Sequence, residues 1–227
     1  MTHLNCFIRF SKTMIIVLVL TISLPASSQT TPDGNAPQFL YPDFTSGTVK
    51  MKNGKSQTTD LNYNTVSEKI VYEKDGNIYD LVNTEMVDTV FLQDTKFVPI
   101  GKIFHEVLLV APISLFVQHK GDLVPPGTPA GYGGTSQVSN TKMMTSVQLS
   151  GGYYNLKLPD DFQVKVDLVY WIRKDNTLNS FLNERQFVKY FPGKEAVVKK
   201  YIKENRIKFD KPSNLVQLVQ YCNEMKQ

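Results

Sequence analysis

Histidine and cysteine, which carry most acid–base, nucleophilic and metal chemistry, are scarce in this chain. Its 227 residues include three histidines and two cysteines. His105 and Glu106 begin like the helix of a zinc protease, but Leu109 stands where the second histidine belongs. The Gly-x-Ser-x-Gly nucleophile elbow is missing as well. The sequence therefore predicts no catalytic residue, no metal and no cofactor, and it favours a protein that is not an enzyme.

Long apolar runs are missing except near the N-terminus. Two basic residues precede an apolar run over residues 14–24, and the small residues Ala26 and Ser28 follow it. This pattern is typical of a secretory signal peptide, here over residues 1–28, and the run is short for a membrane span. We expect a secreted protein, periplasmic or associated with the outer membrane, that does not span the membrane after cleavage. An uncleaved membrane anchor is the alternative.

An excess of charge of one sign is also missing. The chain has 25 Lys and Arg residues against 21 Asp and Glu residues, and the signal peptide accounts for Arg9 and Lys12, which leaves 23 against 21. Because nucleic-acid binding needs a strong basic patch, this near balance argues against a nucleic-acid partner. We expect the basic cluster near the C-terminus to be a solvated helical face. Its members are Lys194, Lys199, Lys200, Lys203, Arg206, Lys208 and Lys211.

Disulfides have no place inside the predicted mature chain. Cys6 leaves with the signal peptide, and Cys222 is then the only thiol. A chain of this length can bury a core without covalent cross-links. We expect Cys222 to be a small buried apolar residue, and a disulfide-linked dimer is the alternative.

Two dipeptides give the clearest structural signals in the chain, Asn53-Gly54 and Asp75-Gly76. A two-residue type I′ turn needs positive φ at both central positions, which these residue types tolerate, so each predicts a β-hairpin. The short connections that follow favour antiparallel neighbours. The expected strands cover residues 49–52, 55–63, 69–74, 77–82, 86–92, 96–100, 102–110 and 113–119.

Two further β elements are expected before the C-terminal region. Residues 146–149 and 153–158 flank a Gly-Gly pair and predict a hairpin, and residues 163–172 alternate as a long closing strand. Val169 and Trp171 interrupt the polar face of that strand. We expect the C-terminal helices to cover them.

From Asn176 onward the apolar residues recur every three to four positions, which predicts three short amphipathic helices. Pro192-Gly193 ends the first helix, and Pro212 begins the third. The apolar positions are, in order, Leu178, Phe181, Leu182, Val188 and Phe191; Val197, Val198, Tyr201 and Ile202; and Leu215, Val216, Leu218, Val219 and Cys222.

These patterns predict an α+β fold. An antiparallel β-meander over residues 47–172 forms a partial barrel or sandwich, and a three-helix C-terminal cap over residues 173–227 packs against it. Residues 29–46 are expected to be a linker whose last, apolar part docks on the β domain.

A long loop rich in Gly and Pro follows the meander at residues 121–141. Loops of this length are either functional or plain connections, and we keep both interpretations. The glycines do not form a phosphate-binding loop, because no lysine follows them. The candidate ligand-contact residues are Tyr132, Gly133, Gly134, Thr135, Ser136, His119 and Trp171.

A metal site near this loop is a weaker hypothesis. His119 and Asp122 lie close in sequence, and Asp160 or Asp161 would have to complete the ligand set. We expect these residues to be solvated polar groups at a strand end.

Several short segments and the helical tail together resemble uncharacterised secreted proteins of Gram-negative bacteria. The resemblance spans most of the predicted mature chain and implies an envelope protein, but it brings no activity or site with it. The segments are Tyr41-Pro42-Asp43-Phe44, Leu61-Asn62-Tyr63-Asn64, Tyr132-Gly133-Gly134-Thr135-Ser136-Gln137 and Leu156-Lys157-Leu158-Pro159.

The sequence leaves three functional hypotheses. The first is a non-catalytic envelope protein that binds another protein or an envelope polymer through its surface. The second is a lipocalin-like barrel for a small apolar molecule or sugar, which the strand count and the aromatic residues permit. The third is a metal-assisted hydrolase, for which the ligands are too few. A membrane-spanning barrel is disfavoured because most strands are shorter than such barrels need. The oligomeric state stays open.

Overall fold

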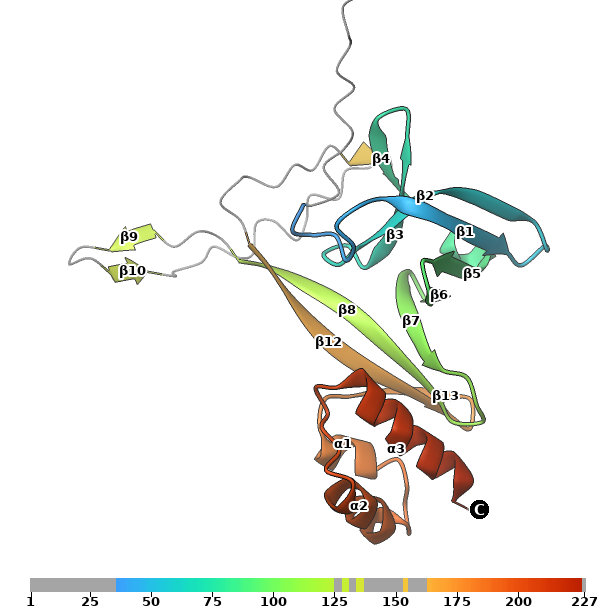
Figure 1. The fold of residues 1–227 in the computed structure, drawn as a ribbon, viewed down its shortest axis with the longest axis vertical. Helices are drawn as coiled ribbons and strands as arrows, with labels where there is room; N and C mark the ends of the chain where they lie inside the picture. The colour runs from blue at the N-terminus through green and yellow to red at the C-terminus, as the bar shows by residue number, and fades with distance from the viewer. Residues whose placement is uncertain (1–35, 125–127, 131–133, 137–152, 155–162, 226–227) are drawn as a thin grey trace, which may run out of the picture.

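The structure is a computed structural model that describes residues 36–124, 128–130, 134–136, 153–154 and 163–225 (Figure 1). The predicted signal peptide, the first part of the predicted linker and most of the predicted hairpin over residues 146–158 lie outside these ranges.

The described residues form one large antiparallel sheet followed by three helices, so the predicted α+β fold with a β-meander is confirmed. Eleven strands follow in the order β11-β4-β3-β2-β1-β5-β6-β7-β8-β12-β13. The order departs from a simple meander at two points. The chain leaves β4, passes through the 3₁₀ turn η1 (Thr84–Met86) and returns to pair β5 with β1. Strand β11 pairs with β4 at the edge of the sheet, although it lies between β10 and β12 in the chain. A separate two-stranded sheet pairs β9 with β10.

The strands expected between residues 49 and 119 are all present, most with boundaries within a few residues of those predicted. The strands are β1 (Thr45–Met51), β2 (Ser56–Asn64), β3 (Lys69–Lys74), β4 (Asn77–Asp80), β5 (Val87–Leu92), β6 (Thr95–Ile100), β7 (Ile103–Leu109), β8 (Ser114–Val124), β9 (Thr128–Ala130), β10 (Gly134–Ser136), β11 (Tyr153–Tyr154), β12 (Gln163–Lys174) and β13 (Thr177–Phe181). The loop predicted over residues 121–141 is in part wrong, because β8 continues to Val124 and the strands β9 and β10 also lie in this segment.

The two predicted hairpin turns differ from one another. Asp75 and Gly76 have φ of 54° and 74°, as a type I′ turn requires. At the other turn only Gly54 has positive φ, and the Met51 N–H donates to the Lys55 carbonyl. That loop is longer than the predicted two residues, with the glycine in the left-handed position.

The turn between β2 and β3 inserts between β7 and β8. Pairing of these two strands begins at Glu106, and beyond that point each strand binds the turn. The Phe104 N–H donates to the Glu68 carbonyl at 2.9 Å, and the Gly121 N–H donates to the Thr65 carbonyl at 2.8 Å. The sheet therefore curls, so that the β2–β3 turn contacts β7 and β8. Within the described residues, the edge strands β11 and β13 are not paired with each other.

Close packing holds this turn in place. The Tyr63 hydroxyl donates to the carbonyls of Phe104 and His119, at 3.0 and 3.3 Å. Gly121 leaves room for the turn, because a Cβ at that position would lie 2.5 Å from the Thr65 Oγ1 atom. Both residues therefore lie in direct contact with the inserted turn or with the strands beside it.

Two apolar cores lie on the curled sheet. The sheet core fills the space inside β1–β7 with fully or almost fully buried side chains, which leaves it packed in the manner of protein interiors. The sheet core consists of Val49, Leu61, Tyr63, Ile70, Val87, Val90, Leu92, Phe97 and Phe104.

The helical core lies between the β8, β12 and β13 strands and the three helices, which gather at one end of the long β8–β12 strand pair (Figure 1). The helices are α1 (Glu184–Val188), α2 (Glu195–Glu204) and α3 (Pro212–Glu224). The Asn183 side chain caps α1 by accepting from the Gln186 N–H at 3.0 Å. None of the helices in the described ranges is both long and apolar enough to cross a lipid bilayer.

Two predictions for the C-terminal region are wrong. Leu178 and Phe181 belong to strand β13 and not to the first helix, because Asp175 and Asn176 both have positive φ and turn the chain into a hairpin with β12. The β domain therefore extends past residue 172. The helices also cover the opposite face of β12 from the one expected, packing on Tyr170 and not on Trp171.

The segment before β1 docks as expected. Phe39 forms an isolated bridge with Asn64, and the Leu40 N–H donates to the Tyr63 carbonyl at 2.9 Å. The Asn62 side chain donates to the Tyr41 carbonyl at 2.8 Å, which holds this segment on β2.

Candidate functional site

A close acid–base pair joins β7 to β8. The His119 Nε2 atom lies 2.6 Å from the Glu106 Oε2 atom, and the two side chains are 12% and 24% exposed. The Tyr63 ring meets the His119 ring edge-on, with centroids 5.8 Å apart. Burial raises the pKa of Tyr63 far above its ordinary value, so that its hydroxyl keeps its proton and serves as a donor.

The pair of Glu106 and His119 has no further partners of the kind that catalysis would require among the described residues. No hydroxyl or thiol side chain is hydrogen bonded to it within the part of the chain that the structure describes. The same residues contain no cluster of three or more His, Cys, Asp or Glu side chains able to bind a metal. The pair of Glu106 and His119 therefore links two strands beside the inserted turn.

A second polar group lies on the opposite face of the same strands. Gln118 donates through Nε2 to the Glu68 carboxylate and accepts from the Trp171 Nε1 atom at 2.8 Å. Burial raises the pKa of Glu68, and its bond to Gln118 partly opposes this rise. His105 lies edge-on to Trp171 with ring centroids 5.5 Å apart. On this face the bond between Gln118 and Glu68 holds the β2–β3 turn against β8.

His105 is a second deeply buried titratable group in this region, beside Tyr63. It is 1% exposed, and burial together with the charge of Arg173 lowers its pKa to about 4. A histidine with this environment stays neutral at physiological pH. It packs as an aromatic residue and is not placed to exchange protons with solvent.

The structure separates the residues that the sequence grouped into one ligand site. His119 pairs with Leu168 and Trp171 pairs with Phe116, so the two candidate side chains lie on opposite faces of the β8–β12 strand pair. Gly134, Thr135 and Ser136 lie in β10, which pairs with β9 and not with β8 or β12. Tyr132 and Gly133 lie outside the described residues.

The hypothetical metal site is likewise not assembled in the described residues. The Asp122 carboxylate lies 3.9 Å from the Lys120 ammonium, and both side chains are about half exposed. His119 turns to Glu106 instead of to Asp122. Asp160 and Asp161 lie outside the described residues.

Sequence reasoning missed the pairing of Glu106 with His119. The available signal was strand parity, because residues 106, 117 and 119 share a face once Glu106 pairs with Val117. The role of Glu68 had no comparable local signal, since its turn reaches Gln118 from a distant part of the chain.

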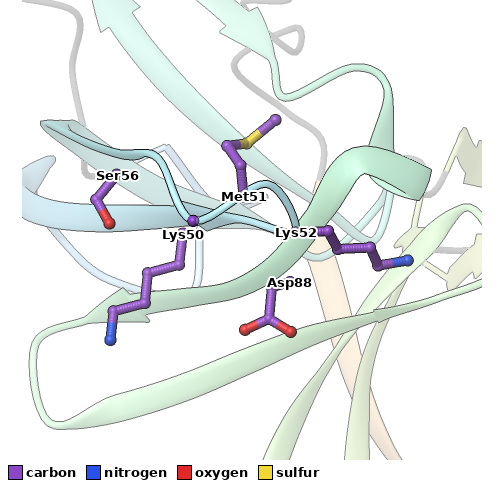
Figure 2. Close-up of a pocket in the computed structure, with 6 residues that line it drawn as sticks. Lys50, Met51, Lys52, Ser56 and Asp88 are labelled. Atoms are coloured by element: carbon purple, nitrogen blue, oxygen red, sulfur yellow. The ribbon is translucent and has the colours of Figure 1, made fainter.

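Two surface hollows within the described part of the chain bring charged side chains together. The first, the sheet hollow, has a volume of about 450 Å³ and is formed by the β1–β2 hairpin and β5. Figure 2 shows Lys50 and Lys52 pointing away from each other, with Asp88 below and between them. The Lys50 ammonium lies 5.0 Å from the centre of the Phe91 ring. The lining residues are Lys50, Met51, Lys52, Gly54, Ser56 and Asp88.

The second hollow, the helical hollow, lies between α1 and α2 and has a volume of about 530 Å³. Three cations line it, from α1, from the residue directly after α1 and from α2, together with the buried side chain of Val188. None of these three cations has an ion-pair partner within 4.0 Å among the described residues. The lining residues are Glu184, Arg185, Val188, Lys189, Glu195 and Lys199.

Comparison of the chain with protein-family models, with curated proteins and with solved structures finds no match. The resemblance to secreted proteins of Gram-negative bacteria stays a prediction. Surface geometry and charge are therefore the guides to function.

Proposed function

We propose that this chain is a non-catalytic protein of the bacterial envelope, exported by its signal peptide, that binds an acidic envelope polymer through the surface of its helical region. The observation that carries this proposal is the separation of charge along the chain. Residues 184–211 contain nine Lys and Arg residues against four Asp and Glu residues, whereas the whole chain has 25 against 21. The excess of positive charge is thus concentrated in one part of the molecule.

The charges of this region are available to a partner. All nine cations except Lys194 are exposed. Among the described residues of this region, an ion pair joins Lys200 to Glu204 at 3.9 Å, and such exposed pairs contribute little stability. On the sheet, in contrast, the Lys69 ammonium lies 2.6 Å from the buried Asp80 carboxylate. A cationic surface with few internal partners attracts polyanions over distances of about 10 Å in 0.1 M salt.

In this proposal the β1–β7 part is a partial barrel that acts as a scaffold. Its interior is occupied by the side chains of the sheet core, which leaves the lipocalin-like alternative without a specific observation in its favour. The hydrolase alternative has no assembled ligand set among the described residues. Surface binding is the function that these features support best.

The test compares two triple variants that each lose three positive charges. The first carries Lys200→Gln, Lys203→Gln and Lys208→Gln, and the matched control carries Lys50→Gln, Lys52→Gln and Lys55→Gln. Dextran sulfate serves as the polyanion and neutral dextran as its reference, and Kd is measured by calorimetry at two salt concentrations. At about 1 kcal/mol for each cation near an anionic surface, the helical variant should bind dextran sulfate at least about tenfold more weakly.

Higher salt should weaken binding by the wild-type protein and reduce the difference between the variants. Equal weakening in both triple variants would show that only total charge matters. Equal binding of dextran sulfate and neutral dextran would also contradict the proposal.

A further inference from the structure

We propose that the helical hollow is a binding site for a single phosphate group, carried by the polymer that the helical surface binds. This inference rests on the proposed function and names the chemical group that one part of the surface recognises. It is argued from the convergence of Arg185, Lys189 and Lys199 on one hollow.

The two helices place these cations by their geometry. Arg185 lies in the short helix α1 and Lys189, four residues later, is the C-cap residue of that helix with helical backbone angles, so the two side chains project from one side. Lys199 projects from α2, one helical turn after Glu195. Both helices are anchored by buried residues, Val188 on α1 and Val198 on α2, so the spacing between the cations is set by the helical core.

The chemistry of the lining suits a phosphate. A guanidinium offers parallel N–H donors that match two oxygens of one phosphate, and lysine ammonium groups add point charges around it. Arg185, Lys189 and Lys199 repel one another and have no ion-pair partner within 4.0 Å among the described residues. A bound dianion would relieve this repulsion. Buried Val188 also lines the hollow, so the lining combines three cations with an apolar side chain.

Two glutamates in the lining distinguish a phosphate from other charged ligands. Glu184 and Glu195 leave the hollow with a net charge of only +1 from its five charged residues. The cations attract a phosphate and the carboxylates repel it. Removing a carboxylate should therefore strengthen phosphate binding. A ligand that also carries an ammonium group would need the carboxylates and would respond in the opposite sense. The sign of the effect at Glu195 therefore identifies the class of ligand.

The sheet hollow provides the internal comparison. It also combines lysines with a carboxylate, but it has two cations instead of three, and they point away from each other (Figure 2). Removal of Lys52 changes the net charge of the protein as much as removal of Lys199 does. It leaves the helical hollow untouched.

The experiment measures binding of pyrophosphate and of glucose 1-phosphate to the whole protein by calorimetry. The variants are Arg185→Gln, Lys199→Gln and Glu195→Gln, with Lys52→Gln as the control. All four side chains are exposed, and far-UV circular dichroism verifies the fold. We expect Arg185→Gln and Lys199→Gln each to raise Kd about fivefold or more. Glu195→Gln should lower Kd about two- to fivefold, and Lys52→Gln should change it less than about twofold.

The possible failures are distinct. If dextran sulfate binds but neither phosphate compound does, the phosphate site is wrong and the proposed function stands. If the phosphate compounds bind as expected but dextran sulfate does not, the site stands and the polymer-binding function is wrong. Weaker binding after Glu195→Gln, or an equal effect of Lys52→Gln, overturns the site. If the protein sediments with phosphatidylglycerol vesicles, and glucose 1-phosphate and Arg185→Gln both prevent this sedimentation, the phosphate belongs to a lipid headgroup and its assignment to a polymer is overturned.

Discussion

Replacing Tyr63 with phenylalanine tests whether the inserted β2–β3 turn stabilises the sheet. The ring of Tyr63 is fully buried and stacks on Phe97, with centroids 5.3 Å apart, and phenylalanine keeps this packing. What disappears is the hydroxyl that donates to the carbonyls of Phe104 and His119. These two residues lie on the strands between which the turn inserts.

The expected loss follows from the geometry of this hydroxyl. It has one proton shared between acceptors at 3.0 and 3.3 Å, so the bond to Phe104 is the stronger one. A neutral hydrogen bond contributes about 1 kcal/mol net, and a buried acceptor left without its donor costs about 1–3 kcal/mol. The free energy of unfolding should therefore fall by about 1–3 kcal/mol. Because burial raises the pKa of Tyr63, this difference should be the same at all pH values below about 10.

Urea denaturation followed by tryptophan fluorescence measures this change, because Trp171 is the only tryptophan in the chain. The midpoint should fall while the slope with urea concentration stays the same. Tyr72→Phe is the matched control, since Tyr72 stacks on Tyr79 at 5.5 Å and its hydroxyl has no hydrogen-bond partner among the described residues. A change below about 0.5 kcal/mol for Tyr63→Phe, or one equal to that of the control, would refute a stabilising role for the insertion.

Three further predictions concern other buried positions. Gly121→Ala places a methyl group 2.5 Å from the Thr65 Oγ1 atom, and we expect a loss of about 1–3 kcal/mol in urea denaturation, partly relieved by Val164→Ala; full stability would contradict the close approach. The pKa of His105 is 6.5 in the unfolded chain, and burial lowers it to about 4 in the folded protein. The stability that neutral His105 contributes is therefore fully present above pH 6.5 and is lost as the pH falls to 4. This loss is about 3 kcal/mol, and His105→Phe should remove it from a series of denaturation curves between pH 7 and 4. Burial raises the pKa of Cys222 to about 12, so a thiol reagent should label it only after unfolding in a protein that lacks residues 1–28; rapid labelling of the folded protein would show that it is exposed.

The sequence was informative where structure depends on neighbouring residues. Asp75-Gly76 predicted a type I′ hairpin, and its two positive φ angles confirm it. Alternating apolar residues located the strands of the meander. The β12–β13 hairpin was missed because its turn, Asp175-Asn176, has no glycine, although asparagine and aspartate also tolerate positive φ. The apolar spacing of Leu178 and Phe181 was then assigned to a helix.

The candidate site was much less predictable than the fold. The polar contacts around the inserted turn join residues far apart in the chain, such as Glu68 to Gln118, and local periodicity contains no information about them. The helical hollow could not be predicted either. Arg185 and Lys199 lie on different helices, and their convergence depends on how α1 packs against α2.

Strand β7 contributes to both apolar cores, with Phe104 in the sheet core and Leu108 packed against the helical core. If the chain were divided after this strand, between most of the sheet and the helices, both fragments would expose hydrophobic surface. Neither half should express as an independent module. Anyone shortening the protein for crystallisation or fusion should trim its ends and leave its middle whole.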